Sequence, residues 1–398
     1  MYLKDIINII GNYNVVNKKI NNIVTDSRLV SEGDVFISIN DGYKYISDAV
    51  KRGAYLIITE KYSGKYNVPI IKVNDSIYTL GLIAKYLRSK YNGIVIAITG
   101  SNGKTTTKEL LSYVLKSKYK VLYNKGSENN NIGVPNTLLS INNEYNYVVL
   151  ELGTNHKGEI RYLTDIVKPD ISIITNIGSS HIGNFGSIDN IYKEKLDIYN
   201  NNILFVNGED KYLNELDCFK VFLNDYDYKC SVNHLQIDYN LVIRVCLYLG
   251  MSYKDIVNRL DSFILNMSRM STEVINNVTI IDDSYNASYE SVVAGLSSLP
   301  DNRKIIILGS MLELGNYSYY YHNSLNDIFN KMNNYYLITI GEDTKVIKSN
   351  KHFDNIDDLI DYVLGFNYIE DDIIYIKGAH KYNLYQVVNA IKGVLQNR

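Results

Sequence analysis

Residues 94–110 constrain the fold of this chain most, because they read as a buried strand, a glycine loop and a helix in direct succession. The run Ile94–Thr99 consists of β-branched residues and one alanine, which is typical of a parallel strand buried on both faces. The loop Gly-Ser-Asn-Gly follows and leads into helix-forming sequence. Glycines let backbone N–H groups turn toward a phosphate, and a helix N-terminus adds partial positive charge there. The segment predicts an α/β fold with a phosphate-binding loop.

The spacing of this loop differs from the common motif. The pattern G-x-x-x-x-G-K-[ST] places a glycine five positions before the second one, and that position is Ile98 here. The shorter string Thr-Gly-Ser-Asn-Gly-Lys-Thr remains. We expect Lys104 to contact the outer phosphates of a nucleotide and Thr105 to bind magnesium. The alternative is an ordinary glycine turn before a helix, with Lys104 in solvent.

Composition narrows the class of protein. The 398 residues are enough for two or three domains, and a net charge of -2 gives no electrostatic sign of binding to nucleic acid or to an acidic membrane. Three cysteines without a C-x-x-C pair suggest neither a disulfide framework nor a zinc site. The N-terminus does not read as a signal peptide, and no apolar run reaches membrane-spanning length. We expect a cytoplasmic enzyme.

Strands and helices alternate along the whole chain, a pattern typical of α/β domains with parallel sheets. We predict a small domain over residues 1–90, a nucleotide-binding domain over 91–266 and a doubly wound domain over 267–398. Expected helices include 48–53, 187–200 and 241–249. Expected strands include residues 34–39, 54–59, 94–99, 121–123, 147–152, 171–175, 203–206, 304–308, 336–340 and 373–376.

Two polar residues follow buried strands of the central domain. Glu151 ends the strand near 147–152, and His181 comes shortly after the strand near 171–175. Open α/β sheets bind ligands at such strand ends, so both residues are expected near the phosphate loop. They could hold a second magnesium ion, although imidazole is an unusual ligand for it. The alternatives are a salt-bridged strand end for Glu151 and a helix-capping role for His181.

Short strings along nearly the whole chain resemble the Mur ligases, the ATP-dependent amide-forming enzymes of peptidoglycan precursor synthesis. Two of them, Asp-Asp-Ser-Tyr-Asn-Ala and Met-Leu-Glu-Leu-Gly, are specific to the subfamily that adds D-alanyl-D-alanine to UDP-N-acetylmuramoyl-tripeptide. The matching segments are Thr25–Arg28, Thr99–Thr105, Asn130–Pro135, Glu151–His156, Thr175–Gly178, Ile281–Ser288, Met311–Gly315 and Lys377–Gly378.

The resemblance implies an N-terminal UDP-sugar domain, a central P-loop ATPase and a C-terminal Rossmann-like domain. It implies an acyl phosphate intermediate, ATP with two magnesium ions, and the tripeptide precursor and D-alanyl-D-alanine as partners; we expect a monomer. Composition alone gives Lys193, Glu194 and Lys195 to a charged, solvent-facing helix surface. The resemblance reverses this for Lys195, which occupies the place of the carbamylated lysine of the family, with Lys193 as a nearby rival.

The resemblance also assigns roles residue by residue. It implies catalytic roles for Lys104, Lys195, His181 and Asn131, and magnesium ligands at Thr105, Glu151, His181 and carbamylated Lys195. Substrate contacts fall on Ser27, Arg28 and Asn286. The implied nucleotide contacts are Gly100, Ser101, Asn102, Gly103, Lys104, Thr105, Thr106, Asn240, Arg269 and Asp283.

Some positions depart from the family pattern. Gln236 and Ile237 stand where the family has a His-Asn pair that helps to bind adenine, and only Asn240 of that motif remains. The segment between 210 and 236 is shorter than usual, and Ser310 replaces an aspartate. Two alternatives therefore stay open: a related ATP-dependent ligase with another carboxylate and amine, and a non-catalytic nucleotide-binding homologue.

Overall fold

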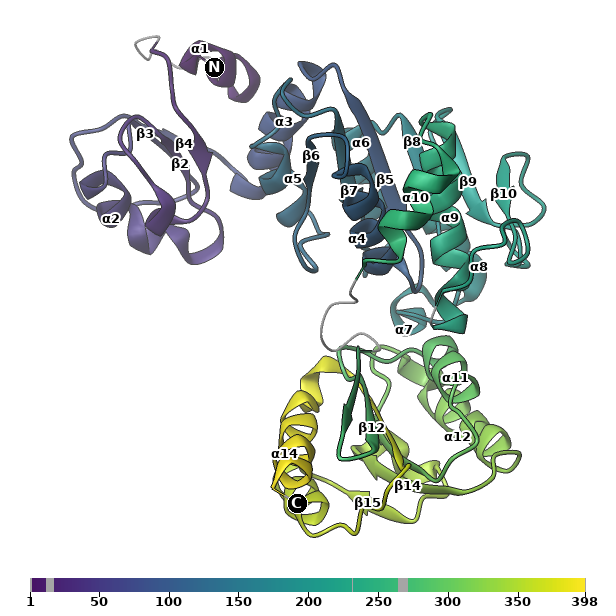
Figure 1. The fold of residues 1–398 in the computed structure, drawn as a ribbon. Coiled ribbons are helices and arrows are strands. Elements are labelled where there is room, and N and C mark those ends of the chain that lie inside the picture. The colour runs from purple at the N-terminus through teal and green to yellow at the C-terminus, as the bar shows by residue number, and fades with distance from the viewer. Residues whose placement is uncertain (1, 12–17, 231, 264–270, 398) are drawn as a thin grey trace. The chain divides into compact units, whose positions relative to one another are not determined.

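The computed structural model describes residues 2–11, 18–230, 232–263 and 271–397, and Figure 1 shows their helices and strands. Contacts divide the chain into two compact units, residues 1–99, 107–174 and 194–205 in one, and 100–106, 175–193 and 206–398 in the other. Within the described ranges the strands form three sheets, which confirms the three-domain α/β fold class. The domain boundaries at 90 and 266 stay predictions.

A four-stranded parallel sheet belongs to the N-terminal part, in the order β1-β2-β3-β4. Its strands are short because the apolar runs between turns are short. Isoleucine, leucine and valine side chains from the strands and from two of the helices form its core. The bounds are β1 (Ile23–Val24), β2 (Val35–Ile37), β3 (Leu56–Thr59) and β4 (Ile70–Lys72), with helices α1 (Leu3–Ile10), α2 (Ile46–Lys51) and α3 (Ser76–Ser89).

The central sheet has six strands: β5 (Ile94–Thr99), β6 (Val121–Tyr123), β7 (Tyr147–Glu151), β8 (Ile171–Ile174), β9 (Ile203–Asn207) and β10 (Phe219–Val221). Their order is β10-β9-β8-β5-β7-β6. β5 pairs in parallel with β7 on one side and with β8 on the other, and all its residues but the first are buried. The strand before the phosphate loop therefore lies inside the sheet, as its composition predicts.

The central helices are α4 (Lys104–Leu115), α5 (Gly133–Leu138), α6 (Glu159–Val167), α7 (Ile182–Phe185), α8 (Ile188–Leu196), α9 (Gln236–Tyr248) and α10 (Tyr253–Leu260). α9 begins earlier than the predicted 241, so that Gln236 lies in its first turn. None of the helices in the described ranges has the length and apolarity needed to cross a membrane.

The C-terminal sheet has the order β11-β12-β16-β13-β14-β15, parallel except for one hairpin. That hairpin joins β11 and β12 through Asn276 and Asn277, which both have positive φ, as a tight two-residue turn requires. The bounds are β11 (Ser271–Ile275), β12 (Val278–Asp283), β13 (Lys304–Gly309), β14 (Tyr335–Ile340), β15 (Lys351–Phe353), β16 (Ile373–Lys377), α11 (Tyr289–Ser297), α12 (Ser318–Phe329), α13 (Ile356–Leu364) and α14 (Tyr385–Gln396).

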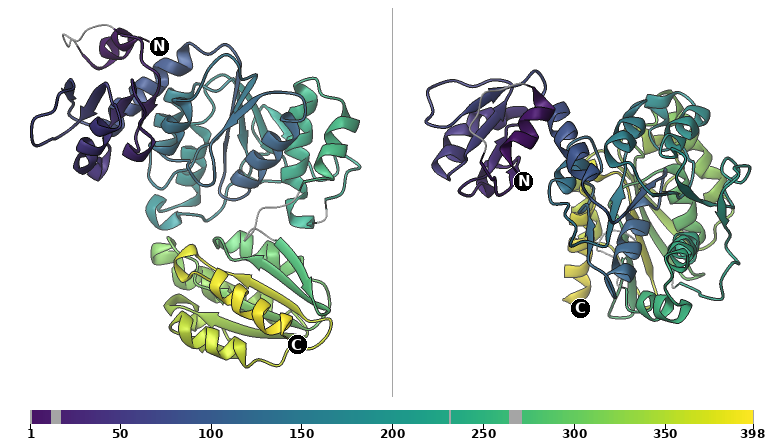
Figure 2. Two further views of the ribbon diagram at one scale, coloured as in Figure 1. Left: turned by 60° about the vertical axis from the view of Figure 1, so that its left-hand side comes forward. Right: turned by 90° about the horizontal axis from the view of Figure 1, so that it is seen from above.

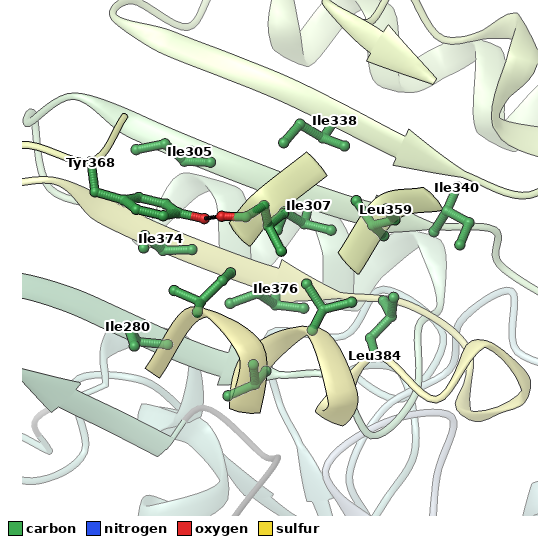
Figure 3. Close-up of a cluster of buried hydrophobic side chains, with 14 of the residues drawn as sticks. Ile280, Ile305, Ile307, Ile338, Ile340, Leu359, Tyr368, Ile374, Ile376 and Leu384 are labelled. Carbon is green, nitrogen blue, oxygen red and sulfur yellow. Dashed lines mark hydrogen bonds between the residues drawn. The ribbon is translucent and has the colours of Figure 1, made fainter. Parts of the chain in front are cut away.

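One face of this sheet carries isoleucines at alternate positions, such as Ile305 with Ile307 and Ile374 with Ile376 (Figure 3). Alternate residues of a strand share a face, so these side chains form one layer against α13 and α14. Figure 1 shows α11 and α12 on the opposite side of the sheet from α14, and Figure 2 shows α14 lying across its face. The sheet is covered on both faces, as in a doubly wound domain.

Candidate active site

The phosphate loop, residues 100–103, has two glycines with positive φ, Gly100 (+153°) and Gly103 (+79°), which other residues rarely adopt. A Cβ at Gly103 would also lie 2.5 Å from a carboxylate oxygen of Asp238. The loop is anchored to the chain after β8: the Ser101 N–H donates to the Asn176 carbonyl (3.0 Å), and the Asn102 N–H donates to Asn176 Oδ1 (2.9 Å). The Gly178 N–H donates to Ser101 Oγ (2.8 Å). The loop shape is therefore fixed by Asn176, which the sequence analysis included in the segment Thr175–Gly178 without a role.

Lys104 and Thr105 open α4 directly after this loop. The Lys104 ammonium donates to the carbonyls of Gly100 (2.8 Å) and Ser101 (3.2 Å), so its charge lies against the loop backbone. Thr105 is buried and Thr106 half-buried. Lys104 is therefore not a freely solvated side chain on an ordinary turn, as the alternative supposed. Cation, hydroxyl and helix N-terminus together suit the outer phosphates of a nucleotide.

Glu151 is the last residue of β7 and is only 1% exposed. Its Oε1 accepts a hydrogen bond from the Asn129 side chain (2.7 Å). The next residue, Leu152, bonds through its N–H to the carbonyl of Ile98 (2.8 Å) and accepts from the Thr99 hydroxyl (2.9 Å). The carboxylate thus stands at the end of the strand beside β5, where the sequence places it.

His181 precedes α7 with a left-handed backbone, φ +63°. Its imidazole Nδ1 pairs with the carboxylate of Glu313, and the Gly183 N–H donates to the Glu313 carbonyl (3.0 Å). The neighbouring Ser180 hydroxyl reaches the Ser101 carbonyl of the phosphate loop (3.4 Å). The His181 side chain makes no capping hydrogen bond to α7, so the helix-capping alternative is wrong for this side chain. It joins the Met-Leu-Glu-Leu-Gly segment instead.

The two rival lysines both lie in α8 but differ in exposure to solvent. Lys195 is 2% exposed, whereas Lys193 lies on the exposed side. Glu194 is buried as well and accepts hydrogen bonds from the N–H groups of Gly158 (2.6 Å) and Ile160 (2.8 Å). The composition-based interpretation of this segment as a solvent-facing surface is therefore wrong for Glu194 and Lys195. Burial distinguishes Lys195 from Lys193 as the lysine fit for a defined role.

In the C-terminal sheet, Asp283 ends β12 and Lys377 ends the adjacent β16. The Lys377 ammonium donates to Asp283 Oδ2 (2.6 Å) and to the Asn286 carbonyl (3.1 Å), and the Tyr375 hydroxyl donates to the same Asp283 oxygen (3.1 Å). Burial beside this carboxylate raises the pKa of Tyr375 well above its usual value. The Asp283 side chain is thus fixed by two donors, while Asn286 is exposed.

The N-cap residue of α11, Ser288, and Glu290 in its first turn make contacts that the sequence analysis did not predict. The Ser288 hydroxyl donates to Asn102 Oδ1 in the phosphate loop (2.7 Å). The Glu290 carboxylate accepts from the Ser179 N–H (2.8 Å) and the Ser179 hydroxyl (3.0 Å). Ser288 lies 186 positions from Asn102, so no spacing in the sequence could have joined them.

The predicted site residues Asn131, Ser27 and Arg28 differ in exposure and are not joined to the phosphate loop by any contact described above. Asn131 is exposed, and Ser27 is buried. The exposed Arg28 hydrogen-bonds to Asp26, which lowers the pKa of that carboxyl. Arg269 lies outside the described residues.

Asn240 has all its polar groups engaged by the protein. Its amide donates to the carbonyls of Phe222 (2.8 Å) and Leu223 (2.9 Å), and its Oδ1 accepts from Gln236 (2.8 Å). The residue is fully buried. Its side chain therefore holds the chain after β10 rather than offering hydrogen bonds to an adenine ring.

The Met-Leu-Glu-Leu-Gly segment is fixed by His322, which is fully buried in α12. The Met311 N–H donates to His322 Nε2 (2.9 Å), and Nδ1 lies 2.8 Å from the Ser318 carbonyl, an arrangement that needs the neutral ring with its proton on Nδ1. Burial lowers the pKa of His322.

We expect His322→Ala to lower the free energy of unfolding by about 1–3 kcal/mol near neutral pH, because the buried Met311 N–H loses its acceptor. A histidine pKa below its unfolded value of about 6.5 makes the stabilising contribution full above that pH and lost as the pH falls. Denaturant unfolding at about pH 8 and about pH 5.5 should thus show a smaller pH dependence in the variant. The matched control is His156→Ala, since that ring is exposed; an equal effect there would contradict the assignment.

The oxygen chemistry of two predicted ligands suits magnesium. Mg²⁺ takes one or two protein oxygen ligands and keeps waters and substrate phosphates for the rest, so a hydroxyl such as that of Thr105 and a carboxylate such as that of Glu151 are each of a suitable kind. No group of three or more histidine, cysteine or acidic side chains placed to hold a metal occurs in the described ranges. Lys195 fits a metal ion only as a carbamate, because an ammonium cannot bind a cation.

The comparisons with known proteins agree with this architecture. The Mur ligase middle domain matches residues 98–225, and the domain described as "Mur ligase, glutamate ligase domain" matches residues 267–380. The chain is 30% identical to the UDP-N-acetylmuramoyl-tripeptide--D-alanyl-D-alanine ligase of Rickettsia prowazekii, over 93% of this chain and 94% of that one. It is 29% identical to the Haemophilus influenzae protein of the same name, over 96% and 95%.

Among solved structures, the MurF ligase from Thermotoga maritima in complex with ADP has a TM-score of 0.83 at 25% identity, covering 95% of this chain and 98% of that one. Sequence similarity to these relatives therefore extends over nearly the whole length of the chain, as does the structural likeness. The chain belongs to the Mur ligase family.

Proposed function

We propose that the chain is the ATP-dependent ligase that joins D-alanyl-D-alanine to UDP-N-acetylmuramoyl-tripeptide, a step of peptidoglycan precursor synthesis. The observation that carries the proposal is the similarity, over more than nine-tenths of both chains, to relatives that bear this name. The phosphate loop with Lys104 against its backbone supports the use of ATP. A cytoplasmic location and a monomeric state remain predictions.

The first chemical step makes the tripeptide carboxylate reactive. A carboxylate oxygen attacks the γ-phosphorus of ATP, and the bond from that phosphorus to the β–γ bridging oxygen breaks. ADP departs, and the carboxylate becomes an acyl phosphate. Lys104 and the loop N–H groups stabilise the charge on the phosphates, and Asn131 is assigned to the γ-phosphate and the reacting carboxylate. Thr105 and Glu151 would hold one magnesium ion, and His181 with carbamylated Lys195 the other. Bound magnesium neutralises charge on the transferring phosphoryl group.

The second step forms the amide. The amine of D-alanyl-D-alanine attacks the acyl carbon, the tetrahedral intermediate releases inorganic phosphate, and the amine loses a proton. Asp283, fixed by Lys377 and Tyr375, is assigned to the nucleotide, as is Arg269, and Asn286 to the incoming substrate. Ser27 and Arg28 are assigned to the UDP-sugar end. The contribution of Asn240 to the nucleotide site is to position the segment at Phe222 and Leu223.

Phosphate release from ATP tests the proposal. We expect release only when UDP-N-acetylmuramoyl-tripeptide and D-alanyl-D-alanine are both present, with mass spectrometry detecting the pentapeptide product. Release with neither substrate would contradict the proposal, and turnover with a different carboxylate and amine would identify a related ligase. ATP binding without any release would identify a non-catalytic homologue.

A further inference from the structure

Lys108 is a buried charge that the steps above leave unused. It lies in α4, and its side chain is fully buried. The ammonium donates to the carbonyls of Asn124 (2.7 Å) and Gly126 (2.9 Å). Two carboxylates lie close by: Glu109 Oε1 at 3.2 Å and Glu151 Oε2 at 3.8 Å from Nζ. Because a buried ammonium is costly unless paired and hydrogen-bonded, this arrangement indicates a specific role.

Lys108 bonds to the turn formed by residues 124–129, and this turn also forms hydrogen bonds with Glu151 at the end of β7. The Asn124 side chain, fully buried, accepts from the Glu151 N–H (2.9 Å) and donates to the Glu151 carbonyl (3.0 Å). It donates as well to the Glu128 carbonyl (2.8 Å), which closes the turn. Asn129, at the end of the turn, donates to Glu151 Oε1 (2.7 Å). The backbone and one carboxylate oxygen of Glu151 are therefore both set by residues 124–129.

The Lys108 ammonium contacts both the turn and the Glu151 carboxylate. It fixes the Asn124 and Gly126 carbonyls, and it lies 3.8 Å from Glu151 Oε2, while Asn129 donates to Oε1. Outer residues that orient a ligating carboxylate typically change metal affinity or activity by about 10- to 100-fold when replaced. We propose that Lys108 is a positioning residue that holds the 124–129 turn and thereby sets the Glu151 carboxylate for magnesium. This rests on the proposed function.

The test is the gain in ADP affinity that magnesium gives, measured by titration calorimetry with ADP alone and with ADP plus Mg²⁺. Lys108→Met keeps the length and apolar stem of the side chain but removes the charge and its hydrogen bonds. We expect the magnesium-dependent gain to fall about 10-fold or more. Affinity for ADP without metal should stay within about 2-fold, because Lys104 and the loop are untouched. Lys125→Met is the control, since Lys125 is an exposed lysine in the same turn.

Each outcome bears on one claim. If wild-type protein shows no magnesium-dependent gain, the proposed function fails at its nucleotide site. If the wild type shows the gain and Lys108→Met keeps it, or Lys125→Met loses it equally, the role of Lys108 is wrong. Should Lys108→Met not fold, Asn129→Ala removes the hydrogen bond to Glu151 Oε1 while the Lys108 ammonium stays, and this variant must reduce the same gain. An unchanged gain in that variant would overturn the proposal.

Discussion

Lys104→Met is expected to lower ATP-dependent phosphate release by about 10²- to 10³-fold, measured with both substrates at saturation. In the structure the ammonium lies against the Gly100 and Ser101 carbonyls, within the loop that receives the phosphates. Phosphoryl transfer depends chiefly on positioning and charge stabilisation. Loss of this ammonium therefore removes a contribution that the uncharged loop residues 100–103 cannot replace. The variant should bind ATP weakly as well.

The control for this prediction is Lys116→Met. Lys116 is an exposed lysine just beyond the same helix, and its ammonium lies over the Tyr123 ring, 3.8 Å from the centroid. We expect near wild-type release from it. Circular dichroism and thermal unfolding must show that both variants fold, because Lys104 also holds the loop backbone. A folded Lys104→Met protein with more than about a tenth of normal turnover would contradict the assignment.

Lys195→Ala is expected to lower turnover about 100-fold or more and to recover part of it when a short-chain carboxylic acid is added. If Lys195 carries a carbamate, its replacement leaves a space in which a small carboxylate can supply the missing oxygens. Phosphate release measured against acetate or propionate concentration should rise and reach a plateau. Bicarbonate should not rescue the variant, because alanine has no amine to carbamylate.

Lys193→Ala is the matched control, since that lysine lies two positions away in α8 and is exposed. It should keep normal turnover and show no response to the acids. A large loss in Lys193→Ala would favour the rival lysine. A Lys195→Ala protein that folds, loses activity and is not rescued would leave Lys195 important but argue against a carbamate.

Local sequence was enough for the parts of the fold that depend on continuous apolar runs. β5 covers the predicted residues, and the central strands that follow differ only at their ends, because β-branched runs bounded by turns have few other ways to bury their side chains. The short edge strands β1, β4, β10, β11 and β15 were missed. Their residues are largely exposed or mixed, as at Thr272 to Val274, and pairing with a neighbour rather than composition makes them strands.

The site was predictable where a motif sits on a strand end and unpredictable where distant segments meet. The positions of Lys104, directly after the loop, and of Glu151, at the end of β7, follow from the glycine turn and from the apolar run before Glu151. Lys108 reads as one more polar residue on a helix, and only the folded turn reveals that it is buried. The engagement of Asn240 by backbone carbonyls likewise depends on a contact across 17 or 18 residues that no pattern encodes.

The strand order of the central sheet also decides when the phosphate loop can form during synthesis. β5 is complete at Thr99, yet the strands on either side of it come from residues 147–151 and 171–174. The loop then needs Asn176 and Gly178 for its hydrogen bonds. A nascent chain that has not reached these residues holds an apolar strand with unpaired edges, a state that favours aggregation. The phosphate loop can therefore take its shape only after the residues up to Gly178 have been synthesised.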